Sequence, residues 1–79
     1  MITMNEIVQK FNVGEGHKGK TPKIDLKTSL QCRVAIKGNT TDANDFINAL
    51  SAQGYSDQAI YNIFLKVYIS MGKPKLEVV

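Results

Sequence analysis

The chain has 79 residues, of which 43% are hydrophobic and 22% are charged, and its formal net charge is +3 at pH 7. This length allows one domain at most, and a domain this small buries only a modest share of its surface, so we expect a partner subunit. The hydrophobic content excludes a fully disordered chain, and the basic charge mildly favours a polyanion as a partner.

Cysteine content and hydropathy indicate the compartment. The single cysteine, Cys32, excludes an intrachain disulfide. Secreted domains of this size usually contain several disulfides, so we expect a cytoplasmic protein in which Cys32 is a small core residue. No apolar stretch approaches the ~20 residues of a membrane span, and residues 1–20 lack the apolar block of a signal peptide. We therefore expect no membrane partner.

The first 28 residues are predicted to form an amino-terminal arm and a linker. Met4, Ile7, Val8 and Phe11 are apolar residues at helical spacing, which indicates either a short docked helix or a frayed arm. The stretch that follows, NVGEGHKGKTP, is rich in glycine and lysine and is typical of a flexible loop.

Within this loop, GEGHKGKT (residues 14–21) has the spacing of a phosphate-binding loop, in which backbone amides and the lysine hold phosphates. Such a loop needs a buried strand before it and a helix that starts at the lysine. Here Pro22 follows at once, and KIDLKTSLQCRV lacks a helical pattern. We interpret the motif as a linker and expect no nucleotide or other cofactor. With one histidine, His17, and one cysteine, the chain also lacks the ligands of a zinc site.

The segment LQCRVAIK (residues 30–37) alternates between two sets of residues, which is the period of a β-strand. One side carries leucine, cysteine, valine and isoleucine, and the other side carries Gln31, Arg33, Ala35 and Lys37. We predict a half-buried strand with a polar and basic outer face, ended by a turn at Gly38-Asn39.

Two helices are predicted after this turn. Thr40 or Thr41 is the expected N-cap of the first helix, and Gly54 is expected to end it. Ser56 is expected to cap the second helix, which carries a broad apolar stripe and stops at Gly72. The width of this stripe indicates burial on more than one side, and hence an oligomer interface.

The order of a strand with a basic face, a turn, a helix, a glycine and a second helix resembles the ribbon-helix-helix family of plasmid and phage repressors and partition proteins. QCRVAIK (residues 31–37) carries the resemblance for the ribbon, and ALSAQGYSDQAIYNIFLKVYI (residues 49–69) carries it for the helices. The resemblance implies an α+β, mostly helical fold. It places a ribbon-helix-helix domain at residues 29–72, an amino-terminal arm at 1–28 and a tail at 73–79, in an intertwined homodimer.

The resemblance also implies sequence-specific binding of double-stranded DNA by a dimeric repressor or plasmid partition protein, with the β-ribbon in the major groove. Gln31 and Arg33 are expected to face base edges, Lys37 to lie nearer the DNA backbone, and Ser56 to approach a phosphate at the amino end of the second helix. Lys18 and Lys20 are expected to add phosphate contacts from the arm. In some partition proteins this arm also touches a protein partner.

The alternative hypothesis is a small phage-type or accessory protein that inhibits or adapts another protein through its helical face. The alternating segment would then join an intramolecular sheet with residues 24–26 or 76–79, and a monomeric state would favour this reading. Neither hypothesis describes an enzyme, because no nucleophile can be paired with a base and an orienting group. The sequence does not reveal the operator or the biological process.

Overall fold

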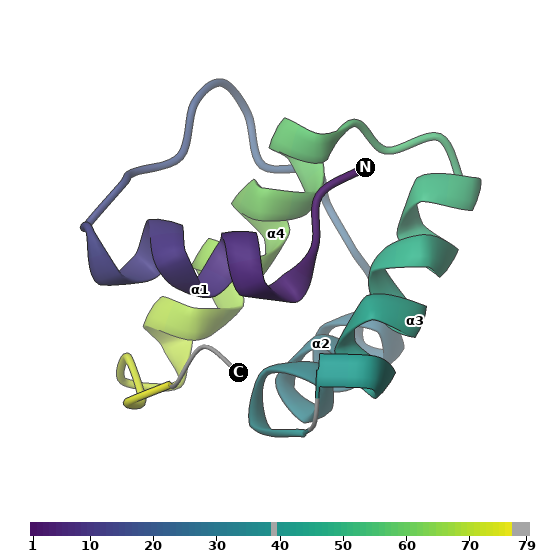
Figure 1. The fold of residues 1–79 in the computed structure, drawn as a ribbon. Helices are drawn as coiled ribbons and strands as arrows, with labels where there is room; N and C mark the ends of the chain where they lie inside the picture. Colours follow the sequence, from purple (N-terminus) through teal and green to yellow (C-terminus); the bar gives the residue numbers. More distant parts are fainter. Residues whose placement is uncertain (39, 77–79) are drawn as a thin grey trace.

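The computed structural model describes residues 1–38 and 40–76, and within these ranges all regular secondary structure is helical (Figure 1). The helices are α1 (Met4–Asn12), α2 (Leu26–Lys37), α3 (Thr40–Ala52) and α4 (Asp57–Ser70). The expected α+β ribbon-helix-helix fold is therefore wrong, because the described residues contain no strand from which a ribbon could form.

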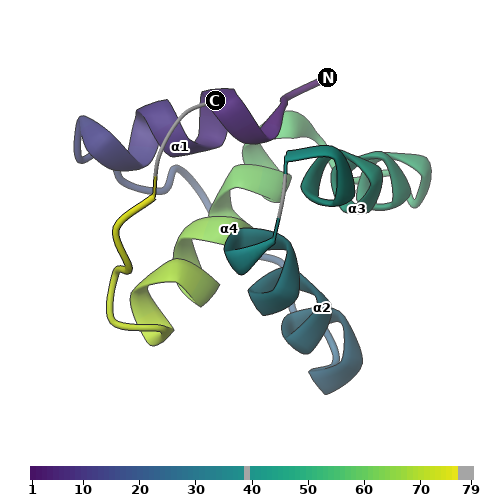
Figure 2. The same ribbon diagram turned by 60° about the horizontal axis from the view of Figure 1, so that its bottom comes forward.

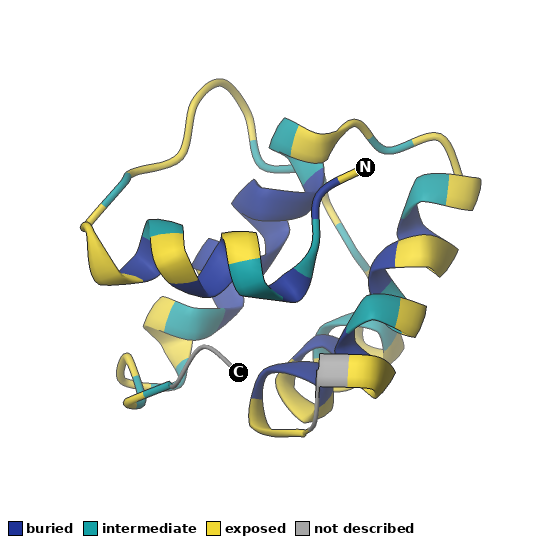
Figure 3. Ribbon diagram, in the orientation of Figure 1, coloured by how far each residue is buried: buried dark blue, intermediate teal, exposed yellow. Residues whose placement is uncertain are grey.

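Helix α4 is the central element of the fold. It contacts α1, α2 and α3, and the view in Figure 2 shows α1 and α2 on different sides of it. Every residue from 60 to 65 is buried, and so is Val67, so α4 is covered on nearly all sides (Figure 3). A helix with so wide an apolar stripe belongs in a core, and the broad stripe noted in the sequence is used mainly inside this chain.

Helix α2 occupies the segment predicted to be a strand. The Asp25 side chain caps it by accepting a hydrogen bond from the Thr28 amide at 2.8 Å. Cys32, Ala35 and Ile36 are buried, and their spacing is that of one helical face. The helix prevails because it satisfies its own backbone groups, whereas a lone strand has no partner for them. The expectation that residues 23–34 lack helical structure is thus also wrong.

The change from strand to helix alters which side chains are buried. Leu30 and Val34, predicted to share the inner face of the strand, are exposed, and Ala35, predicted to face outward, is 4% exposed. Cys32 and Ile36 are buried under either periodicity, and the prediction that Cys32 is a core residue is confirmed.

The two carboxy-terminal helices are confirmed. Helix α3 ends shortly before Gly54, whose φ of 98° suits glycine. Ser56 is the N-cap of α4, and its Oγ accepts a hydrogen bond from the Ala59 amide at 3.1 Å. Gly72, with a φ of 82°, follows the end of α4. The predicted turn at Gly38-Asn39 involves residue 39, which lies outside the described residues, as do residues 77–79 of the tail.

Helix α1 is docked on the core, which is one of the two alternatives that the sequence left open. Thr3 caps it, and its apolar residues at helical spacing are all buried. The Phe11 ring stacks on Tyr68 of α4 with a centroid distance of 4.1 Å and an interplanar angle of 6°. The Met4 amide also donates a hydrogen bond to Asn44 Oδ1 of α3 at 2.8 Å. Among the described helices, none has the length and apolar character needed to cross a bilayer.

Candidate functional site: an apolar groove between α2 and α3

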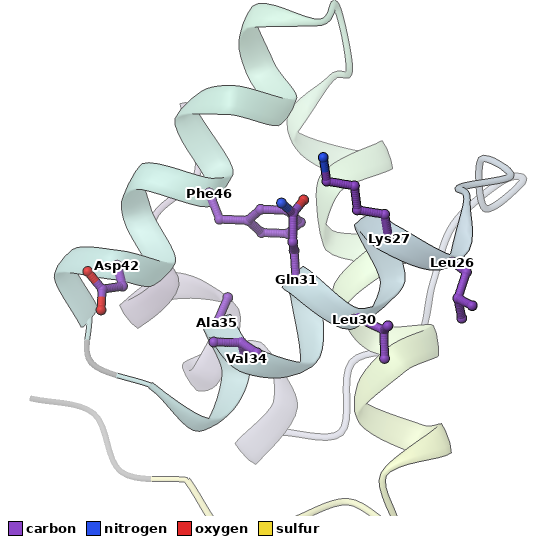
Figure 4. A pocket seen from close by; sticks show the side chains of 8 residues that line it. All are labelled: Leu26, Lys27, Leu30, Gln31, Val34, Ala35, Asp42 and Phe46. Carbon is purple, nitrogen blue, oxygen red and sulfur yellow. The ribbon is translucent and has the colours of Figure 1, made fainter.

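A groove of about 670 Å³ lies between α2 and α3 (Figure 4). We call it the α2–α3 groove, and most of the residues that line it are apolar. Its apolar lining is Leu26, Leu30, Val34 and Ala35 of α2 with Phe46 of α3, and its polar lining is Lys27, Gln31 and Asp42.

Three large apolar residues form an exposed stripe along the outer face of α2. Leu26 is 74% exposed, Leu30 is 49% exposed and Val34 is 69% exposed. They follow one another at intervals of one helical turn, so they lie on one face. Single exposed apolar residues are common, but a contiguous apolar surface beside a groove is typical of an interaction site.

The stripe exists because α2 is apolar on two sides. Cys32 and Ile36 pack into the core of this chain, and Leu26, Leu30 and Val34 lie on the side that the described residues leave uncovered. A helix that is apolar on opposite sides is normally buried on both. The second side of α2 therefore lacks a cover within the described chain.

The floor of the groove is anchored to the core. Phe46 is half-buried, and its ring packs against Phe64 of α4 with a centroid distance of 5.9 Å and an interplanar angle of 56°. Ala35 is buried beside it, and its small side chain leaves room in the groove. A floor held by core residues is preformed, as binding pockets usually are.

Charged residues occupy the two ends of the groove. Figure 4 shows Lys27 near the start of α2 and Asp42 at the opposite end, in the first turn of α3. Gln31 also lines the groove and lies between them along its length. The groove is thus apolar along its length, cationic at one end and anionic at the other.

The residues expected to contact DNA from the ribbon all lie on α2. Gln31, Arg33 and Lys37 are exposed. Arg33 and Lys37 are one helical turn apart on the outer side of the helix, while Gln31 lines the α2–α3 groove. They do not form the single outward row that a strand would have presented.

The arm residues Lys18 and Lys20 lie in the loop between α1 and α2, in another part of the molecule from α2 (Figure 1). The loop is held by Asn62 of α4, whose Nδ2 donates to the Lys18 and Lys20 carbonyl oxygens at 2.8 and 3.4 Å. Asn62 Oδ1 accepts from the Lys18 amide at 3.3 Å. The phosphate-loop spacing has no helix starting at its lysine, because α2 begins only at Leu26.

Ser56 lies at the amino end of α4, which the sequence associated with a phosphate. Its hydroxyl is used as a cap, and the adjacent Asp57 carboxylate accepts a hydrogen bond from the Ile2 amide at 3.0 Å. This helix end is therefore contacted by the chain's own amino-terminal segment.

Titratable groups do not converge at the groove. Among residues 1–38 and 40–76, no three His, Cys, Asp or Glu side chains gather closely enough to hold a metal ion. Burial raises the pKa of the Cys32 thiol to about 12, which disfavours the reactive thiolate. The arrangement at the groove is suited to docking an apolar surface.

Sequence reasoning missed the groove because Leu30 and Val34 were assigned to the buried face of a strand. The spacing of Leu26, Leu30 and Val34 is a helical signal that was present in the sequence. Phe46 carried no comparable signal, since its place beside α2 depends on how α3 packs.

Comparisons of the chain with protein-family models, with curated proteins and with solved structures gave no match.

Proposed function

We propose that this protein is a protein-binding module whose α2–α3 groove docks an apolar helix of a second polypeptide chain. The observation that carries the proposal is the exposed stripe of Leu26, Leu30 and Val34 on a helix whose other face is in the core. Covering this stripe removes apolar surface from water, at roughly 25 cal/mol for each Å² covered. The proposal corresponds to an accessory protein that adapts or inhibits another protein through its helical face.

The shape of the groove favours a helix as the docked element. The stripe from Leu26 to Val34 rises by about 12 Å along α2, because each helical residue rises by about 1.5 Å. Two neighbouring helices with a groove between them accept the side-chain ridge of a third helix. Recognition then depends on apolar anchors placed one turn apart, as in other helix-in-groove complexes.

Site-specific photocrosslinking tests this proposal. A benzophenone amino acid replaces Leu30 in the groove, and a matched variant carries it at Asn48, which is exposed on α3 and does not line the groove. We expect a covalent protein adduct from position 30 and none from position 48.

The adduct is then identified by mass, and the captured protein is purified. We expect Leu30→Asp to weaken its binding at least tenfold, which is about 1.4 kcal/mol. The absence of any adduct from position 30, or equal adducts from both positions, contradicts the proposal.

Binding of double-stranded DNA is a second candidate function. A DNA-binding protein of this kind would act in repression or plasmid partition. The observation that favours it is the pair Arg33 and Lys37, exposed one turn apart on a helix, since the major groove admits a helix. Leu30 and Val34 lie beside this pair, however, and offer no hydrogen bonds to base edges. We therefore rank it below protein binding.

Fluorescence anisotropy with labelled duplex DNA separates the two candidates. DNA binding through α2 predicts an affinity that falls steeply between about 50 and about 200 mM salt. It also predicts a loss of affinity in Arg33→Ala/Lys37→Ala, with Lys66→Ala/Lys75→Ala, two exposed charges outside α2, as the matched control. No detectable binding at the lower salt concentration removes this candidate.

A cytoplasmic setting is part of the proposal. Cys32 is a free, buried thiol rather than half of a disulfide, as is usual for proteins of a reducing compartment.

A further inference from the structure

We propose that the chain docked in the α2–α3 groove is a second copy of this chain, with the two α2 helices antiparallel about a two-fold axis near Leu30. The inference rests on the proposed function, because it names the occupant of that groove. It is carried by the symmetry of the stripe and by the charges at its two ends.

The stripe is self-complementary when α2 is paired with an antiparallel copy. Leu30 is its midpoint, with Leu26 one turn before it and Val34 one turn after it. A two-fold axis near Leu30 brings the two Leu30 side chains together, and each Leu26 then meets Val34 of the second copy. One patch thereby covers its own copy, as in the isologous interface of a symmetric dimer.

The charges at the ends of the groove fit the same arrangement. Lys27 and Asp42 line the groove at opposite ends and lie on the α3 side of the stripe (Figure 4). The antiparallel arrangement places each Lys27 beside Asp42 of the second copy, and two-fold symmetry forms this contact twice. A parallel arrangement would place the α3 sides of the two copies on opposite sides of the stripe, so that neither Lys27 nor Asp42 would meet a charge of the second copy. The charge pattern therefore favours the antiparallel direction for a second copy.

Gln31 is compatible with a position close to the axis. It follows Leu30 directly, is exposed, and lines the groove between the two charged ends. A glutamine amide has both a donor and an acceptor, so two symmetry-related Gln31 side chains can hydrogen-bond to each other. No polar group at the centre of this interface has to lose its hydrogen bonds.

The expected dimer is small. Helix α2 has 12 residues and is thus about 18 Å long, so the contact falls at the low end of specific interface sizes. We expect dissociation in the micromolar range. Sedimentation equilibrium from about 1 µM to about 1 mM covers the range of affinity that such contacts have.

Charge reversal gives the decisive experiment. In Lys27→Asp, both charge contacts of the dimer join two carboxylates, and in Asp42→Lys both join two ammonium groups. We expect each variant alone to dimerise at least tenfold more weakly than the parent chain. In an equimolar mixture, each Lys27→Asp chain pairs with an Asp42→Lys chain and both contacts are again between opposite charges. We expect the mixture to recover dimers.

Two further variants keep the test specific. Lys66→Asp changes the same charge on α4 outside the α2–α3 groove, and we expect it to leave the dimer unchanged. Leu30→Asp places a carboxylate at the axis, and we expect a monomer. Circular dichroism confirms that every variant is folded before it is sedimented.

The possible results separate this inference from the proposed function. A parent chain that stays monomeric at about 1 mM overturns the second copy as the occupant, and so does a dimer that tolerates Leu30→Asp. Failure of the mixture to dimerise overturns the antiparallel pairing. If the crosslinker at position 30 captures a different protein, the groove keeps its role and only its occupant changes. An adduct of twice the chain mass supports both proposals.

Discussion

Asn62 shows how one buried polar side chain attaches a polar loop to the core. It is 1% exposed and makes hydrogen bonds to the Lys18 amide, to the Lys18 and Lys20 carbonyl oxygens and to the Gln58 side chain. A buried amide needs such partners, because an unsatisfied one is costly. The Tyr61 hydroxyl also donates to the Glu15 carbonyl oxygen. The loop that composition predicted to be flexible is therefore attached to α4 at two neighbouring positions.

We expect Asn62→Ala to lower the free energy of unfolding by about 2 kcal/mol, because the loop loses its buried partner. Urea denaturation measures this loss, and hydrogen exchange should show faster exchange of the Lys18 amide. Gln58→Ala is the matched control, since it removes only the 2.9 Å hydrogen bond to Asn62 Oδ1. Equal stability of the Asn62 variant and the parent would show that the loop is not held in this way.

Cys32 gives a second prediction at the residue scale. Burial raises the pKa of its thiol from 9.0 to about 12, so the folded state holds the proton more tightly than the unfolded state. We expect no reaction with a thiol reagent at pH 8 until the protein unfolds, because the thiolate is the reactive form. Asn48→Cys in a Cys32→Ala background is the exposed control and should react at once.

The sign of the pH dependence follows from the same shift. A thiol whose pKa is raised on folding contributes stability below its unfolded pKa, and this contribution is lost as the pH rises from about 9 toward about 12. In the Cys32→Ala variant this thiol is absent, so we expect its free energy of unfolding to decrease less than that of the parent over the same pH range. Identical alkaline profiles for the variant and the parent would contradict the shift.

At the scale of elements, a capping side chain marks the start of both α2 and α4. Gly54 follows the end of α3 with a positive φ, and the Ser56 side chain caps the start of α4. Both signals depend only on neighbouring residues, so these helix ends were predictable from the sequence. Asp25 caps α2 in the same way, but the alternation in residues 30–37 favours a strand. Two periodicities overlapped in residues 30–37, and the cap was the signal that distinguished them.

The Asp25 cap has a pH dependence. Hydrogen bonds from Thr28 to the carboxylate are the main cause that lowers the pKa of Asp25, with a smaller contribution from the Lys27 charge. The cap is therefore fully present above the ordinary pKa of an aspartate and is lost as the pH falls through the lowered value. We expect faster exchange of the Thr28 amide in strong acid. Asp25→Asn keeps a capping side chain that does not titrate, and its Thr28 amide should show no such change.

At the scale of the whole molecule, the groove arises from packing. Phe46 lies on α3 and the stripe lies on α2. The two meet because one face of α2 packs into the core through Cys32, Ala35 and Ile36. Only then does the opposite face of α2 become an uncovered apolar surface beside α3. No local pattern contains this information, because it depends on which of two apolar faces finds a partner within the chain.

Neighbouring substitutions on α2 test this packing directly. In a strand, Val34 and Ile36 share a face, whereas in α2 Val34 is 69% exposed and Ile36 is 3% exposed. We expect Val34→Asp to change the free energy of unfolding of the monomer by less than about 0.5 kcal/mol. Ile36→Asp should cost more than about 4 kcal/mol, because it buries an unpaired charge. Thermal melts below about 1 µM, where dimers dissociate, make the comparison; similar losses for both variants would favour a strand.

The sequence alone determined the elements whose signals are local: the helices at 40–52 and 57–70 with their Gly54 and Ser56 boundaries, and the core position of Cys32. Tertiary structure decided which face of residues 26–37 is buried, so that Leu30 and Val34 face outward and meet Phe46 in a groove. The physical reason is that capping and turn formation depend on a few adjacent residues. The choice between two apolar faces depends instead on the area that each can bury against distant parts of the chain.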